Sequence, residues 1–191
     1  QAAAALADLA RHPATARFIA EKLVRHFVSD EPPTAAVAVV EAAFRESEGH
    51  LPTVHRALLE LPQAWDGDYR KFKPPYDYLL SVHRGLDLET VRANQVLGPL
   101  RLMNQVPFSA PTPSGWDDTR DHWAAPAALK QRIDWSIAVA ERLANDVDLQ
   151  GAAGRLIPPA ANPALAVSIS RAESTAQGLG LLLASPDFQW R

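Results

Sequence analysis

The sequence of 191 residues contains no cysteine. This absence excludes disulfides, thiolate ligands for a metal and catalysis by a cysteine nucleophile. It leaves the cellular compartment open, because a helical domain of ordinary size folds without disulfides.

Long hydrophobic runs are also missing. The longest apolar stretches, such as residues 179–184, are far shorter than the roughly 20 residues that cross a bilayer, so we expect no membrane span. The chain starts at Gln1 and runs directly into a helical segment at residues 2–10, with neither a basic start nor a cleavage-like site. We therefore expect a C-terminal fragment of a longer chain, whose missing N-terminal part is its first partner.

A surplus of either charge is absent as well. The chain has 19 basic and 22 acidic side chains, which give a formal charge of -3. A protein without excess positive charge has little to hold a nucleic-acid backbone, so we expect no nucleic-acid partner. The hydrophobic content of 47% and charged content of 21% are typical of a chain that folds.

No segment alternates polar and apolar residues with period two, so we expect no significant sheet. Apolar residues instead recur every three or four positions, which predicts amphipathic helices. The most regular stripe is Leu129, Ile133, Ile137 and Ala140. The fold class that we predict is all-α, an irregular array of about seven to nine helices in one domain over residues 1–191. Gly98-Pro99 should break or kink a helix over 90–105, and residues 145–162 should hold at most one short helical turn.

One long irregular stretch interrupts this pattern at residues 106–126. It contains several prolines together with Trp116 and Trp123. A loop of this length in a compact domain is unusual and is often functional. It also provides an alternative sub-boundary within the single domain.

Several segments, taken in order along the chain, resemble the C-terminal part of the bacterial family known as domain of unknown function 1800. They are His12-Pro13-Ala14-Thr15-Ala16-Arg17-Phe18-Ile19-Ala20, Phe44-Arg45-Glu46-Ser47, Lys71-Phe72-Lys73-Pro74-Pro75, Pro107-Phe108, Pro113-Ser114-Gly115-Trp116 and Leu182-Leu183-Ala184-Ser185-Pro186-Asp187-Phe188-Gln189.

The resemblance implies a helical, uncharacterised protein that is exported to the periplasm or the extracellular space of a bacterium. It also implies a partner, because genes of the family often lie beside those of an exported, sulfatase-like protein. The resemblance supplies no catalytic residues, since none is established for the family.

The loop contains the densest group of potential metal ligands. Asp117, Asp118, Asp121 and His122 place three carboxylates and an imidazole within six residues. Such donors suit a divalent ion such as calcium, zinc or manganese, although the spacing is not that of a calcium-binding EF-hand. The simpler interpretation is a solvated acidic turn that the two tryptophans hold against the core.

Two other groups could bind a ligand. Trp116 and Trp123 could stack on a sugar ring, and the stretch around Lys71 and Lys73, with Tyr69 and Arg70, could hold an anionic polymer. The simpler interpretation of the lysines is that their stems cover apolar surface.

The histidines show no paired spacing of a helical zinc site, and no nucleophile elbow or phosphate-binding glycine loop is present. We expect His12 to satisfy a helix start and His83 to be a hydrogen-bonded, partly buried side chain. We therefore expect no resident cofactor and favour a non-catalytic interaction or assembly module of an exported bacterial protein. The alternatives are a metal-dependent enzyme or binding protein that uses the acidic loop, and a carbohydrate-binding module that uses the tryptophans.

Overall fold

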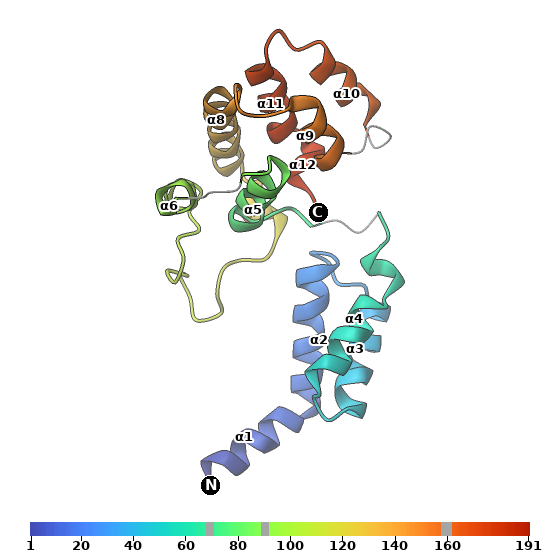
Figure 1. Ribbon diagram of the computed structural model, residues 1–191. Coiled ribbons are helices and arrows are strands. Elements are labelled where there is room, and N and C mark those ends of the chain that lie inside the picture. Colours follow the sequence, from blue (N-terminus) through green and yellow to red (C-terminus); the bar gives the residue numbers. More distant parts are fainter. Residues whose placement is uncertain (68–70, 89–91, 158–161) are drawn as a thin grey trace. The chain divides into compact units, whose positions relative to one another are not determined.

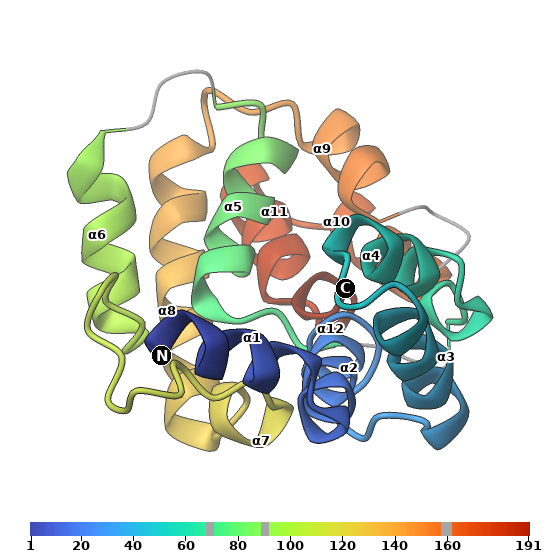
Figure 2. The same cartoon turned by 90° about the horizontal axis from the view of Figure 1, so that it is seen from below.

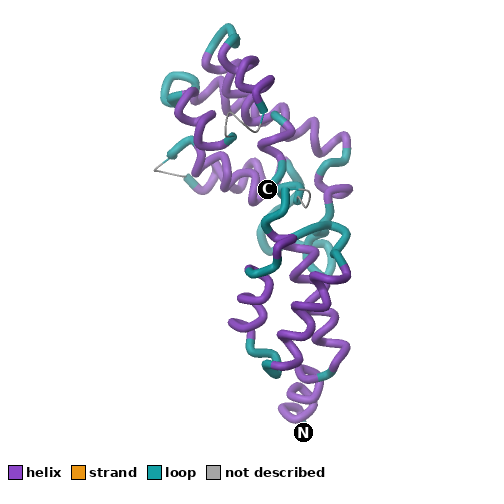
Figure 3. Tube along the Cα trace, turned by 90° about the vertical axis from the view of Figure 1, so that its right-hand side faces the viewer, coloured by secondary structure: helices purple, strands orange, loops and turns teal. Residues whose placement is uncertain are grey.

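A computed structural model describes residues 1–67, 71–88, 92–157 and 162–191 (Figure 1). These residues form twelve α-helices and one 3-10 helix, with no strand among them (Figure 3). The only β-type pairing in this part of the chain is an isolated antiparallel bridge between Phe72 and Trp190. The predicted all-α class is confirmed, and the helices are more numerous than the seven to nine expected because several are only one or two turns long.

The chain divides into two compact units, Gln1–Lys71 and Phe72–Arg191. The division falls at the Lys71/Phe72 junction. The loop at 106–126, which provided an alternative boundary from the sequence, lies inside the second unit.

The first unit contains four α-helices and a 3-10 turn. Its core is a cluster of small and branched apolar residues, among them Ala20, Val24, Val40 and Val54. The elements are α1 (Ala2–Arg11), α2 (Pro13–Phe27), α3 (Thr34–Glu46), α4 (Leu51–Leu59) and η1 (Pro62–Ala64). Helices α2, α3 and α4 pack on one another, whereas α1 extends beyond them (Figures 1 and 3).

His12 separates α1 from α2 and caps the second helix. Its Nδ1 accepts a hydrogen bond of 3.1 Å from the backbone N–H of Ala14. Proline at the first position of α2 has no N–H to satisfy, so imidazole and proline together complete the helix start. The predicted role of His12 is confirmed.

The second unit is built around α11, whose core side chains Leu179, Leu182 and Leu183 are fully buried. Helix α11 packs against α8, α9, α10 and α12 (Figures 1 and 2). The elements of this unit are α5 (Pro75–Gly85), α6 (Ala93–Leu102), α7 (Arg120–Trp123), α8 (Pro126–Leu143), α9 (Leu149–Leu156), α10 (Pro163–Ser170), α11 (Thr175–Ala184) and α12 (Pro186–Gln189).

The structure differs from two local predictions for this unit. Of the break or kink predicted at Gly98-Pro99, the break is absent, because helix α6 continues through Pro99 in its interior. The proline there removes the one N–H that would bond to the carbonyl four residues earlier. Residues 149–156 form a helix of eight residues, α9, rather than a single turn. Its glycines lower its intrinsic helix propensity, and packing against α11 and α5 stabilises it instead.

Candidate functional site

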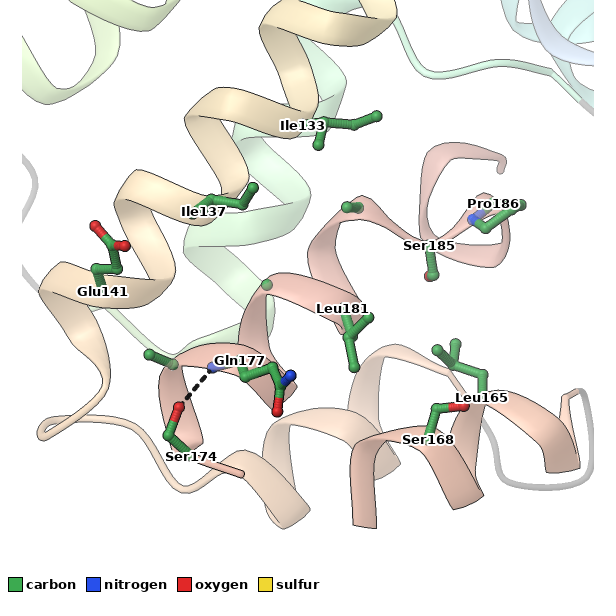
Figure 4. Close-up of a pocket in the computed structure, with 13 residues that line it drawn as sticks. Ile133, Ile137, Glu141, Leu165, Ser168, Ser174, Gln177, Leu181, Ser185 and Pro186 are labelled. Carbon is green, nitrogen blue, oxygen red and sulfur yellow. Dashed lines mark hydrogen bonds between the residues drawn. The ribbon is translucent and has the colours of Figure 1, made fainter. Parts of the chain in front are cut away.

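The second unit contains an open, mostly apolar groove of about 690 Å³ between α8, α10 and α11. Ile133, Ile137 and Glu141 lie in a row along α8, and Leu181 lies on the neighbouring helix α11 (Figure 4). Leu165 and Ser168 of α10 form the opposite side, and Ser185 and Pro186 lie at one end (Figure 4). A concave, largely apolar surface of this size is a common form of binding site.

The apolar side chains of the groove are exposed. Ile133, Ile137 and Leu181 are 37%, 47% and 41% exposed. Single exposed apolar residues are ordinary on a protein surface, whereas several that line one groove indicate a surface for interaction.

The groove exists because α8 turns a different face toward the core. The buried residues of this helix are Arg132, Ser136, Val139 and Ala140. Ile133 and Ile137 follow Arg132 and Ser136 by one residue, which is about 100° around a helix with 3.6 residues per turn. Within the apolar stripe of α8 that the sequence shows, Ala140 is therefore buried, whereas these two isoleucines line the groove.

Close packing between α8 and α11 sets the floor of the groove. A Cβ atom on Gly180 would lie 3.8 Å from the Cβ of Ala140, so small residues meet where the helices are close. Ser174 begins α11, and its hydroxyl accepts a hydrogen bond of 3.1 Å from the N–H of Gln177. This cap fixes the end of α11 that borders the groove.

Among the residues that line the groove, Glu141 carries the only charge. The hydroxyls of Ser168 and Ser185 donate to backbone carbonyls within their own segments, over 2.9 Å and 2.8 Å. These hydroxyl donors are thus used internally. The groove offers a partner an apolar surface with one negative charge at the Glu141 end (Figure 4).

The core beneath α8 contains a buried arginine that sequence reasoning missed. Arg132 is 1% exposed, and its guanidinium carbon lies 4.6 Å and 5.2 Å from the ring centroids of Phe72 and Tyr78. Its Nη1 donates to Gln189 Oε1 over 3.1 Å, and its Nη2 is buried without a hydrogen-bond partner. Burial lowers the pKa of Arg132 to about 10. Its position on the apolar side of a helix, four residues before Ser136, was the only sequence signal.

The two predicted ligand-binding lysines are engaged within their own units. Lys71 is buried and pairs with Asp30. Lys73 Nζ donates to the carbonyl of Phe188 over 2.7 Å and lies 4.1 Å from the centroid of its ring. Burial lowers the pKa of the Lys73 ammonium to about 8. Tyr69 and Arg70, the other residues of that predicted cluster, lie outside the described residues.

The acidic loop brings together two of the four predicted metal ligands. His122 Nδ1 lies 3.1 Å from Asp117 Oδ2, and both side chains are exposed. Asp121 is exposed and pairs with the neighbouring Arg120 over 3.5 Å, and Asp118 has an interaction of its own. Within residues 1–67, 71–88, 92–157 and 162–191, no three His, Cys, Asp or Glu side chains are grouped as metal ligands. The metal site in this loop stays a prediction.

The tryptophans of the loop pack on each other rather than presenting two open faces. Trp123 is 3% exposed, and its indole N–H donates to the carbonyl of Asp117 over 2.7 Å. The ring centroids of Trp116 and Trp123 are 6.2 Å apart. This burial leaves only Trp116 to meet a sugar, and it matches the simpler interpretation of an anchored loop.

None of the helices in the described part of the chain is both long enough and apolar enough to cross a membrane. No curated protein and no solved structure matches the chain.

The fold and the groove place the chain among all-helical proteins with an open apolar groove. They do not by themselves identify an activity. The family model described as "Protein of unknown function (DUF1800)" matches residues 1–190. The chain therefore belongs to the DUF1800 family.

Proposed function

We propose that this chain is a non-catalytic interaction module that binds an amphipathic helix in the groove between α8, α10 and α11. The observation that carries the proposal is the exposed row of Ile133 and Ile137, which lines the groove together with Leu181.

The dimensions of the groove suit a short helix. Ile133 and Glu141 are eight residues apart on α8, which corresponds to about 12 Å or slightly more than two turns. A partner helix with apolar anchors at positions i, i+3 or i+4 and i+7 has its anchors on the same length scale. Burying half of an aliphatic side chain contributes about 1 kcal/mol, so three such contacts favour association without making it permanent.

Glu141 adds orientation to this apolar contact. A carboxylate at one end of the groove favours a partner with a lysine or arginine near the matching end of its helix. Because the site is open to solvent, the pair would contribute up to about 1 kcal/mol and would weaken with salt.

A photo-cross-linking side chain at position 137 tests the proposal, with the same side chain at Asp134 as the control. Asp134 is also exposed on α8 but does not line the groove. In the native host we expect a cross-linked protein from position 137 and none of the same mass from position 134. The cross-linked peptide should be helical and apolar on one face. Equal yields at both positions, or cross-links to small molecules alone, would refute a helix-binding groove.

We also propose that the module works outside the inner membrane of a bacterium, and that a sulfatase-like protein encoded beside it is a partner. The setting that the family resemblance implies supports this part of the proposal, together with the match to the family model over residues 1–190. Cell fractionation with an antibody to the chain tests the location, and finding it only in the cytoplasm would contradict it.

The metal-dependent alternative retains one observation in its favour, the contact of 3.1 Å between His122 and Asp117. Elemental analysis of the purified chain, with a thermal melt in calcium, manganese and zinc, tests it. A ligand that binds only the folded state must raise the melting temperature. A rise that Asp118→Ala and Asp121→Ala abolish would favour the metal site, and no metal and no rise would remove it.

A further inference from the structure

A second exposed apolar surface among the described residues lies on helix α1. None of its ten described residues is buried, and Leu6 and Leu9 are 66% and 62% exposed. Both leucines lie on one face together with Ala2, at positions i, i+4 and i+7. This is the spacing by which an amphipathic helix enters an apolar groove.

Helix α1 is held at a fixed angle to the helix that follows it. Thr15 Oγ1 donates to the carbonyl of Leu9 over 2.7 Å, and His12 between the helices caps α2. Within its own unit, α1 extends past the end of the α2–α4 group rather than folding back on it (Figures 1 and 3). A projecting helix with an uncovered apolar face is available to another molecule.

We propose that the groove between α8, α10 and α11 receives helix α1 of a second copy of this chain. The proposal rests on the helix-binding function of the groove and names its occupant. Every chain carries one such helix and one such groove, so two copies that exchange α1 close a symmetric dimer with two identical contacts.

The area of the two contacts is sufficient for association. A ten-residue helix is about 15 Å long, and one face of it would bury roughly 300–400 Å² on each side of the contact. Two reciprocal contacts therefore bury about 1,200–1,600 Å² in total, which lies in the range of specific interfaces. The apolar face of α1 is formed mainly by alanines and two leucines, so we expect a dimer that dissociates at micromolar concentration.

The absence of native cysteine makes a mixed disulfide experiment specific. One full-length variant carries Leu9→Cys and a second carries Ile137→Cys, and the two are mixed and oxidised. Because the cysteines are on different molecules, only contact between copies can join them. We expect the mixed dimer to form at least tenfold faster than with a control variant that carries Asp134→Cys. Equal rates for the two pairs would overturn the proposal.

Charge substitutions in α1 supply an independent measurement. Leu6→Asp, at an exposed position, should abolish the concentration-dependent dimer in sedimentation without changing the melting temperature. Ala4→Asp, on the opposite face of α1, should leave it intact. A chain that is monomeric at all concentrations, or a dimer that Leu6→Asp leaves unchanged, would overturn the proposal.

Mixing complementary variants separates this proposal from the function of the groove. Leu6→Asp disrupts the helix side of the contact, and Leu181→Asp disrupts the groove side. A mixture of the two variants retains one intact contact, between α1 of the Leu181→Asp copy and the groove of the Leu6→Asp copy. The mixture should therefore form heterodimers, although neither variant dimerises alone. If no dimer forms while photo-cross-linking at position 137 captures a helix of another protein, the groove functions as proposed and only this occupant is wrong. If position 137 captures nothing, both proposals fail.

Discussion

Truncation of Ile137 and Val139 to alanine compares the two faces of α8 directly. Val139 is 3% exposed and belongs to the core cluster around α11, whereas Ile137 is about half exposed in the groove. The two positions are two residues apart on the same helix. The difference between their losses of stability therefore reports where each side chain points.

The expected losses of stability follow from the carbons removed. Val139→Ala deletes two buried carbons and leaves a cavity, which costs about 2 kcal/mol. Ile137→Ala deletes three carbons of which about half the surface is already in water, a loss of about 1.2 kcal/mol that the better helix propensity of alanine reduces by about 0.4 kcal/mol. Ile137→Ala should therefore lower the free energy of unfolding by less than about 1 kcal/mol.

Urea denaturation followed by tryptophan fluorescence measures both losses. Trp135 lies 5.7 Å from Tyr78 in the core of the second unit and reports its unfolding. The two substitutions should have the opposite order of effect on the affinity of the groove for its partner helix. Ile137→Ala should weaken that affinity about fivefold to tenfold, the equivalent of about 1.2 kcal/mol. Val139→Ala should leave the affinity of the folded protein unchanged. Equal destabilisation by both substitutions would show that Ile137 is covered in the isolated chain, and the groove would not be open.

Three further predictions test the packing and the protonation of the second unit. Gly154→Ala should stabilise by about 0.5–1 kcal/mol in a urea titration, because an added Cβ on α9 meets no atom within 4 Å, whereas Gly85→Ala should destabilise by about 1–3 kcal/mol because its Cβ would overlap the Leu156 side chain; the opposite order would refute the packing. Tyr78→Phe should cost about 1–2 kcal/mol, since the buried hydroxyl contacts Ser136 Oγ at 2.6 Å and the Leu183 carbonyl at 3.1 Å, and Tyr76→Phe, at an exposed side chain, should change stability by less than about 0.5 kcal/mol. Burial lowers the pKa of His83, so the folded state takes up the proton less readily than the unfolded state; stability should be full above about pH 6.5 and fall as the pH decreases, and a His83→Gln variant with an unchanged pH profile would contradict this.

The helical class and most helix positions could be predicted from the sequence because they depend on local signals. Prolines at helix starts, the cap at His12 and the periodic stripe of α2 act within a few residues. His83 is partly buried as predicted, but the prediction that it is hydrogen-bonded was wrong, for the opposite reason. Both of its ring nitrogens are buried without a hydrogen-bond partner, and whether a partner is present depends on segments distant in the sequence.

The candidate site could not be predicted for the same physical reason. An apolar stripe indicates that a helix face leaves water, but it does not say whether the chain itself or another molecule covers that face. On α8 the stripe of Ile133 and Ile137 lies beside a second face whose polar residues are buried by Tyr78 and Gln189, and those contacts join segments 57 and 58 residues apart. No periodicity in α8 alone distinguishes the two faces.

The arrangement of α8 bears on what the chain is built to do. Burying Arg132 with one nitrogen unpartnered reduces stability, because removing a charged group from water is costly when its hydrogen bonds are incomplete. Turning Ile133 and Ile137 inward instead would bury apolar surface and avoid that cost. A helix that leaves two isoleucines in a groove forgoes the free energy of burying them, and stability lost in this way is a recurrent property of functional surfaces. The orientation of α8 therefore supports the proposal that the groove binds a partner.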